Sequence, residues 1–206
     1  MRTLELFAGT QSFSKGVMRS SPHNEVITVE KMEKLRPSVC ADILTWDYTV
    51  FTPGYFDVIW CSPPCQAYSR AKTVGVRDLE TADACVRRCF EIIDYLQPRT
   101  WILENPQTGL LAHRMDWIRH GLTSYDVDFC AYGKPYRKRT RLWSNRPFAL
   151  RLCAGSQACP AMNEDRHIGS CGNTTARYNA FGSLTALQKG ALPEPLIDEI
   201  VGQIGG

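Results

Sequence analysis

Short apolar runs alternate along the chain with longer stretches in which apolar positions recur every three or four residues. The runs predict buried strands at residues 3–7, 26–30, 39–43, 56–60, 100–103, 125–130 and 141–143. The longest periodic stretch predicts a helix over residues 79–96 that Pro98 ends, and helices are also expected over residues 12–18 and after Pro193. This alternation predicts an α/β fold with a mostly parallel sheet and helices on both faces.

The regular pattern fails from about residue 145 to residue 178. We therefore divide the chain into a core of residues 1–144, a small irregular lobe of residues 145–182 that contains Cys and His residues, and a C-terminal segment of residues 183–206 that returns to the core as a helix. A length of 206 residues suits one domain with a substantial core, and a monomer is the default expectation.

The composition, 44% hydrophobic and 22% charged, is typical of a soluble globular protein. No apolar run approaches the roughly 20 residues of a membrane span, so no membrane partner is expected. The first residues lack the features of a signal peptide, which favours an intracellular, reducing compartment such as the cytoplasm or nucleus of a host. In that setting the nine cysteines are better explained as core residues, metal ligands or a nucleophile than as disulfides.

The net charge of +3 decides little, but basic residues cluster in one segment. They are Lys134, Arg137, Lys138, Arg139 and Arg141. Such a cluster can bind a polyanion, or it can form an ordinary solvated face.

Residues able to carry chemistry end the predicted strands or lie just beyond them, at the sheet edge where such folds bind ligands. They are Gly9, Glu30, Asp42, Cys65 and Glu104. Gly9 lets the backbone approach a ligand, and the following helix offers free amides to a carboxylate or phosphate, although such turns are often only structural. Glu30 could bind a ribose diol, and Asp42 with Ile43 could flank an adenine. Taken together and in this order, they suggest an adenosine-containing cofactor.

Cys65 lies in a loop, directly after two prolines and before polar residues. A free cysteine is most often a small buried hydrophobe, but a loop thiol at this edge of the sheet is a better candidate for a nucleophile. Its thiolate would need nearby positive charge, which Arg139 or Arg141 could supply. Glu104 could be a carboxylic acid with a raised pKa, or it could merely cap the following helix.

Four elements of the sequence resemble the DNA cytosine-C5 methyltransferases in order and spacing, from Thr3 to about Ile200. They are "ELFAG", "PCQAYS", "LENP" and the Arg-x-Arg of "KRTRLW". The cysteine after two prolines is the most specific, since amino methyltransferases carry an aromatic residue after their prolines and no cysteine. The resemblance implies a Rossmann-like fold that uses S-adenosylmethionine to methylate C5 of cytosine in duplex DNA.

The resemblance also implies roles for individual residues. Cys65 matches the nucleophile that attacks C6 of a cytosine flipped out of the helix, and Glu104 matches the residue that holds or protonates N3. Arg139 and Arg141 match the arginines that grip the flipped base and support the nucleophile. The residues assigned to the S-adenosylmethionine pocket are Phe7, Ala8, Gly9, Thr10, Glu30, Lys31, Asp42, Ile43, Pro64, Gly190 and Ala191. The candidates for DNA contact are Gln66, Ser69, Arg70, Lys134, Arg137 and Lys138.

The sequence departs from the family pattern at several points. The second glycine of the first motif is replaced near Gln11, Pro106 stands where valine is common, and Arg137 aligns with a usual glutamine. The large target-recognition domain of many members is missing, as in the minimal phage and large-virus members. We therefore expect a short or relaxed target sequence.

The lobe contains three cysteines and a histidine that could hold zinc: Cys153, Cys159, His167 and Cys171. The spacing is not that of a standard zinc knuckle, so cysteines that simply pack in an irregular lobe are the alternative. In function, such a lobe would replace the missing recognition domain.

Two other functions stay open beside DNA methylation. One is cytosine-C5 methylation of RNA such as tRNA, and the other is a catalytically silent DNA-binding or regulatory homologue. The presence of Cys65, Glu104 and the arginine pair argues against the silent homologue.

Overall fold

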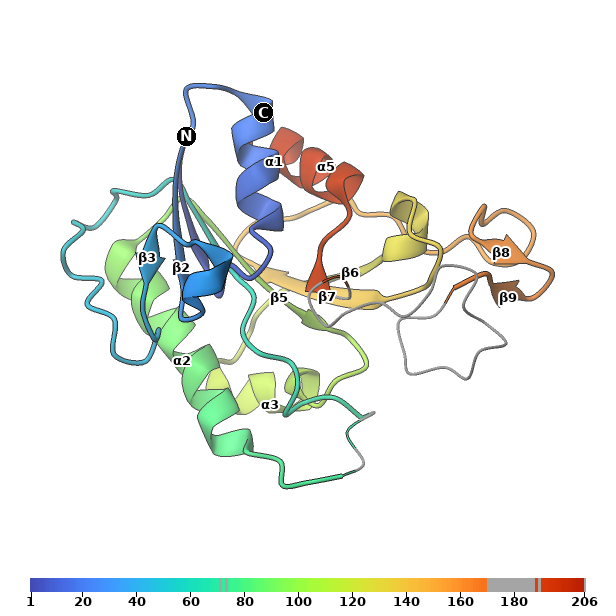
Figure 1. The fold of residues 1–206 in the computed structure, drawn as a ribbon, viewed down its shortest axis with the longest axis horizontal. Helices are drawn as coiled ribbons and strands as arrows, with labels where there is room; N and C mark the ends of the chain where they lie inside the picture. Colours follow the sequence, from blue (N-terminus) through green and yellow to red (C-terminus); the bar gives the residue numbers. More distant parts are fainter. Residues whose placement is uncertain (71, 73, 170–187, 189, 206) are drawn as a thin grey trace.

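The computed structural model describes every residue of the chain except 71, 73, 170–187, 189 and 206. Its centre is a seven-stranded sheet in the order β3-β2-β1-β4-β5-β7-β6 (Figure 1). The strands are β1 (Arg2–Leu6), β2 (Glu25–Glu30), β3 (Val39–Cys40), β4 (Val58–Cys61), β5 (Thr100–Pro106), β6 (Ser124–Asp128) and β7 (Arg139–Ser144). The first five run parallel, and β7 is antiparallel to both β5 and β6. The predicted α/β fold with a mostly parallel sheet is confirmed.

Helices cover both faces of the sheet. One face carries α1 (Ser12–Ser20) and α5 (Glu194–Gly205), and the other carries α2 (Leu79–Leu96) and α3 (Leu111–Ile118) (Figure 1). Because successive side chains of a strand point to opposite faces, β4 serves two cores. Its Val58 and Trp60 pack with α1 and α5, whereas Ile59 and Cys61 pack with α2.

The strand directions determine where a site can form. Parallel strands place their carboxyl ends at one edge of the sheet, and ligands of such folds bind there. Since β7 runs opposite to β5, the start of β7 reaches the same edge as the end of β5. The basic segment that precedes and enters β7 therefore lies beside the residues that end β5.

The predicted helix over residues 79–96 is observed with those bounds as α2. The Asp78 side chain caps it by accepting the Thr81 N–H, and Gln97 ends it in a left-handed conformation. Helix α3 is absent from the sequence prediction, because it is short and Leu110 at its N-cap offers no polar capping side chain.

Two predicted strands are too long. The strand expected over residues 125–130 ends at Asp128, and a 3-10 turn over Phe129–Tyr132 follows it. The strand expected over residues 39–43 is reduced to Val39–Cys40, so Asp42 lies in the loop beyond it.

The described part of the predicted lobe, residues 145–169, contains one short hairpin at the end of the molecule beyond β7 (Figure 1). It pairs β8 (Met162–Asn163) with β9 (Arg166–His167). The remaining lobe residues, 170–182, lie outside the described residues. After them, α5 packs on α1. Among the described residues, no helix combines the length and the apolar character needed to cross a membrane.

The close contact between α1 and α5 depends on Gly16. A Cβ at this position would overlap Cγ2 of the buried Ile197 side chain. We expect Gly16→Ala to lower the free energy of unfolding by about 1–3 kcal/mol, because overpacking outweighs the gain in helix propensity. Urea unfolding measures this change.

Gly202 of α5 provides the matched control, since a Cβ there would meet none of the described residues within 4 Å. Gly202→Ala should therefore stabilise the protein by up to about 1 kcal/mol. Equal stability of the two variants would show that the α1–α5 contact does not require a glycine.

Candidate functional site

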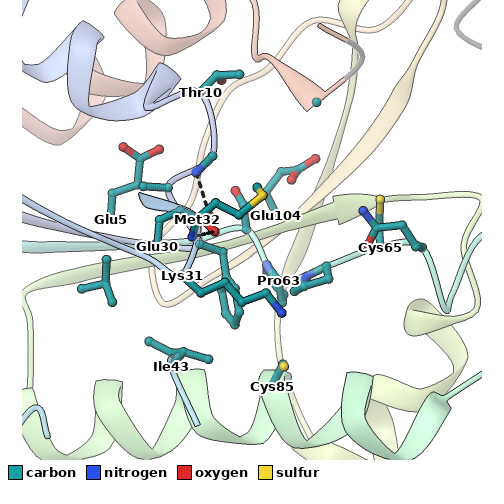
Figure 2. A pocket seen from close by; sticks show the side chains of 18 of the residues that line it. Glu5, Thr10, Glu30, Lys31, Met32, Ile43, Pro63, Cys65, Cys85 and Glu104 are labelled. Atoms are coloured by element: carbon teal, nitrogen blue, oxygen red, sulfur yellow. Dashed lines mark hydrogen bonds between the residues drawn. The ribbon is translucent and has the colours of Figure 1, made fainter. Parts of the chain in front are cut away.

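A cavity of about 450 Å³ opens at the carboxyl edge of the parallel strands (Figure 2). Its volume is in the range of small-molecule sites. Of the residues predicted to bind the cofactor, all except Ala191 line it: Phe7, Ala8, Gly9, Thr10, Glu30, Lys31, Asp42, Ile43, Pro64 and Gly190. The predicted nucleophile Cys65 and the predicted acid Glu104 line the same cavity.

The loop between β1 and α1 forms one wall. Phe7, Gly9 and Gln11 all have left-handed backbone, with φ of 56°, 48° and 57°. A Cβ at Gly9 would lie 3.8 Å from the Phe7 carbonyl oxygen, which is an ordinary contact distance. The positive φ, rather than crowding, therefore favours glycine at this position.

Gln11 occupies the region where the family pattern has its second glycine. Its backbone adopts the conformation that glycine adopts most readily, at a cost of about 1–2 kcal/mol for a residue with a Cβ. Its side-chain Nε2 donates to the carbonyl oxygens of Leu35 at 2.8 Å and Arg36 at 3.2 Å. The loop thus keeps the required shape, and the departure from the pattern leaves the cavity intact.

Glu30, the last residue of β2, is fixed by two backbone amides. The Gly9 N–H donates to Oε2 at 3.2 Å, and the Met32 N–H donates to Oε1 at 3.1 Å (Figure 2). Each carboxylate oxygen has a further lone pair, so Glu30 can still accept hydrogen bonds from a diol. Ile43 and Cys85 line the cavity below it, with the exposed Asp42 at the rim.

Cys65 lies at the other end of the cavity, well away from Ile43 (Figure 2). The buried Asn105 side chain donates to the Pro63 carbonyl oxygen at 3.0 Å and so ties the loop to β5. The Tyr68 N–H donates to the Cys65 carbonyl oxygen, and the Tyr68 hydroxyl donates to Asp83 of α2 at 2.9 Å. The loop that carries the thiol is therefore anchored on both sides.

Glu104 lies inside β5 and not at a helix terminus, so the helix-cap interpretation is wrong. Its side chain is buried, and Oε1 has no hydrogen-bond partner among the described residues. A buried carboxylate oxygen without a partner is costly, and here it lines a cavity that can admit a donor.

Among the described residues, Lys138, which directly precedes β7, is the cation that acts on both Cys65 and Glu104. Its Nζ lies 3.9 Å from Glu104 Oε1, and its side chain lines the cavity. The sequence interpretation assigned Lys138 to DNA contact. Alternation along the strand could have suggested its position, since residues 138 and 139 must face opposite ways.

Arg139 and Arg141 do not line this cavity. In the antiparallel pair of β6 and β7 they lie opposite Asp128 and Asp126, and each guanidinium binds its carboxylate through two nitrogens. The positive charge expected beside Cys65 therefore comes from Lys138 and not from these arginines.

The charges around the two candidate catalytic groups oppose one another. Burial and the Glu104 carboxylate raise the pKa of the Cys65 thiol, while Lys138 acts to lower it. Burial also raises the pKa of Glu104, although Lys138 and a hydrogen bond with Ser62 act to lower it. A thiol beside a carboxylic acid is therefore favoured over two neighbouring anions.

The predicted DNA-contact residues lie around the mouth of the cavity or beyond it. Gln66 is exposed and lines the cavity, and Arg70 is exposed in the loop that follows. Ser69 lies between them, and its N–H donates to the Gln66 carbonyl oxygen. Arg137 is partly exposed but binds Asp128 at 3.1 Å.

The residues predicted to hold zinc lie apart from the cavity. Cys153, Cys159 and His167 come together as expected, but the fourth nearby donor is Cys130, which the sequence interpretation placed in a strand. Cys171 lies outside the described residues. The 3-10 turn that ends β6 early is what presents Cys130 to the lobe.

No family model matches the chain. It is similar to a protein of Frog virus 3 (isolate Goorha) described as "Probable DNA (cytosine-5)-methyltransferase", with 38% identity over 184 residues covering 82% of each chain. Among solved structures it is similar to a prophage-encoded E. coli protein assigned as a DNA modification methyltransferase, with a TM-score of 0.54, 18% identity and coverage of 70% of this chain and 46% of the other. The Entamoeba histolytica methyltransferase EhMeth has a TM-score of 0.54, 15% identity and coverage of 73% and 56%.

The chain thus spans about half the length of these two solved proteins, which share its fold. The predicted methyltransferase fold is confirmed.

Glu5 is a further buried carboxyl group at the cavity, and the sequence interpretation missed it. Its Oε2 accepts the N–H of Ser14 at 3.0 Å and also the Ser14 hydroxyl. Burial raises the pKa of Glu5 from 4.5 to about 7, so the folded protein binds this proton more tightly than the unfolded chain does. Stability should be full below the unfolded pKa and should fall by about 3 kcal/mol as the pH rises through about 7.

Glu5→Gln should remove this part of the pH dependence. Urea unfolding at about pH 5 and about pH 8 should show a smaller loss of stability in Glu5→Gln than in the wild type. Glu25→Gln, at an exposed position, serves as the control and should follow the wild type. A Glu5→Gln variant with the unchanged wild-type slope would mean that Glu5 is ionised in the folded protein.

Proposed function

The chain belongs to the DNA (cytosine-5)-methyltransferase family, and from this premise we propose that it methylates C5 of a flipped cytosine in DNA, using S-adenosylmethionine and a covalent bond to Cys65. The observation that carries the proposal is that one cavity joins Cys65, Glu104 and Lys138 to the residues of a nucleotide-like pocket.

The half of the cavity near β2 suits the cofactor. Glu30 would accept hydrogen bonds from the ribose hydroxyls, since acidic residues at this strand end bind ribose in nucleotide-binding sheets. The apolar Ile43 and the neighbouring Met32 would contact the adenine, and the loop of residues 7–10 would face the amino-acid part. When bound, S-adenosylmethionine supplies an electrophilic methyl group on a sulfonium.

The half near Cys65 suits the cytosine base. A Cys65 thiolate would form a bond from Sγ to C6, and the electron pair of the C5–C6 double bond would become available at C5. C5 would then take the methyl group as the carbon–sulfur bond of the sulfonium breaks and its electron pair stays on sulfur. Loss of the C5 proton to a base would restore the double bond and expel the Cys65 thiolate. C5 and C6 cannot be reached in this way inside a stacked duplex, so the base must swing out into the cavity.

Glu104 and Lys138 would supply the electrostatics of this addition. Glu104, with its raised pKa, would donate a hydrogen bond to N3 of cytosine, which satisfies the buried oxygen that lacks a partner. A neutral Glu104 no longer disfavours the Cys65 thiolate, and Lys138 then stabilises the thiolate. Gln66, Ser69, Arg70, Lys134 and Arg137 would contact the DNA around the opening.

The function is tested by transfer of a tritiated methyl group from S-adenosylmethionine. Duplex DNA, single-stranded DNA and tRNA would be compared, with 5-methylcytosine identified in the digested product. We expect transfer to duplex DNA. Transfer to tRNA alone would replace DNA as the substrate, and methylation at another atom of the base would overturn the proposed chemistry.

We predict that Cys65→Ser abolishes methyl transfer while S-adenosylmethionine still binds, since the cofactor contacts come from other strand ends. Duplex DNA with 5-fluorocytosine should trap the wild type as a covalent adduct that survives denaturing gel electrophoresis, because fluorine at C5 blocks the elimination. Cys40→Ser, at an exposed thiol outside the cavity, should form the adduct normally. Sustained turnover by Cys65→Ser would exclude Cys65 as the nucleophile.

We predict that Lys138→Met lowers the rate and moves the rising limb of the pH–rate profile for kcat/KM to higher pH. The direction follows because Lys138 acts to lower the pKa of Cys65.

Glu104→Gln should lose about 10²–10⁴-fold in rate, the usual contribution of a general acid or base.

Lys134→Met is the matched control for Lys138→Met. If Lys134 contacts a phosphate, its loss should reduce the salt slope of DNA binding by about one and leave the pH–rate profile in place. Indistinguishable pH–rate profiles for Lys138→Met and the wild type would exclude the proposed role of Lys138 at the thiolate.

A further inference from the structure

Four metal-binding side chains meet at the junction between the sheet and the lobe, apart from the catalytic cavity. They are Cys130, Cys153, Cys159 and His167, and their ligand atoms all lie within 4.8 Å of one another. Cys130 comes from the 3-10 turn after β6, Cys153 and Cys159 come from the segment after β7, and His167 comes from β9. Segments far apart in the sequence thus converge on one point.

The two distances from the histidine to its neighbouring thiols fit tetrahedral zinc. The His167 Nε2 lies 3.5 Å from Cys153 Sγ and 3.7 Å from Cys159 Sγ. Zinc bonds of about 2.3 Å to sulfur and about 2.0–2.1 Å to nitrogen place two such ligands about 3.5–3.6 Å apart at the tetrahedral angle. Three thiolates and one imidazole form a ligand set used by structural zinc sites.

The start of the lobe packs on the second core through Phe148 and Leu150, but from residue 153 onward the described residues have little apolar packing to hold them. The hydrophobic cluster that joins them to the sheet consists of Cys130, Cys159 and Ala161, with Cys153 and Met162 packed against it. The ligand cysteines thus make up most of that cluster. A two-stranded hairpin as short as β8–β9 is marginal on its own, whereas bound zinc contributes folding free energy directly.

We propose that Cys130, Cys153, Cys159 and His167 bind one structural zinc ion that fixes the lobe to the end of β6. This assignment differs from the sequence prediction in one ligand, with Cys130 in the place of Cys171.

The site is connected to the basic segment by two direct contacts. The Cys153 N–H donates to Asp128 Oδ2 at 2.9 Å, and Asp128 is the carboxylate that binds Arg139. Phe129, the neighbour of Cys130, lies under Lys138, with Nζ 4.8 Å from the ring centroid. Zinc binding would therefore order the residues against which Lys138 packs. An effect on catalysis through Lys138 rests on the proposed function, whereas the zinc site itself does not.

Metal analysis tests the site directly. Wild-type protein purified without chelators from zinc-replete cells should contain about one zinc per chain by mass spectrometry, and cobalt(II) in its place should give the strong visible bands of a tetrahedral thiolate site. Cys130→Ser and Cys153→Ser should lose the metal. If either variant fails to fold, the cobalt spectrum of the wild type still decides whether a thiolate-rich tetrahedral site exists.

Two matched controls separate the possible failures. Cys171→Ser should keep its zinc. If Cys171→Ser lost zinc while Cys130→Ser kept it, the assignment of Cys130 as the fourth ligand would be wrong. Cys65→Ser should keep zinc although it is inactive, and zinc in a wild type that methylates nothing would support the site while refuting the proposed function. A metal-free wild type that is fully active, or one with a disulfide among these cysteines, would overturn the zinc site.

Discussion

The antiparallel register between β5 and β7 decides which side chains of the basic segment can reach the cavity. Glu104 pairs with Leu142, so the side chains at positions 142, 140 and 138 share its face, and Arg139 and Arg141 face the other way. A slip of one residue would exchange the two sets completely. The position of Lys138 beside Glu104, and thus the charge available to Cys65, follows from this pairing and not from the number of basic residues nearby.

The same strand pairing also determines which carboxylates the side chains of the basic segment bind. Asp128 is fully buried and binds both Arg137 and Arg139, Asp126 binds Arg141, and Glu104 attracts Lys138. Among the described residues, Lys134 alone of the cluster forms no ion pair. Removing the partner of a buried charge such as Asp128 typically costs about 3–5 kcal/mol, so Arg139 is committed to holding β6 and β7 together. The charge that remains for a polyanion is smaller than the sequence suggests.

The sequence was sufficient to locate residues at the ends of strands. Glu30 ends one apolar strand and Cys65 follows another, so the position of each in the chain is enough to assign both to one edge of the sheet. Lys138 could not be distinguished from its arginine neighbours, because the choice depends on a register set by a distant strand. Cys130 lies in an apolar run that continues the sequence of β6, so the pattern predicted a strand residue. Its side chain reaches the lobe because a 3-10 turn replaces the strand at Phe129. The short α3 begins without a capping side chain and therefore left no signal.

The edges of the sheet have a consequence for self-association. One edge strand, β3, is only two residues long. The other, β6, is partly covered by the start of the lobe, where the Asp128 N–H donates to the Arg151 carbonyl oxygen and Phe148 packs edge-on against Tyr125. Long open edges invite strand addition by other copies and thereby aggregation, and short or covered edges protect against it. The start of the lobe thus shields the sheet, so its loss would leave β6 as an open edge strand to which another copy could pair.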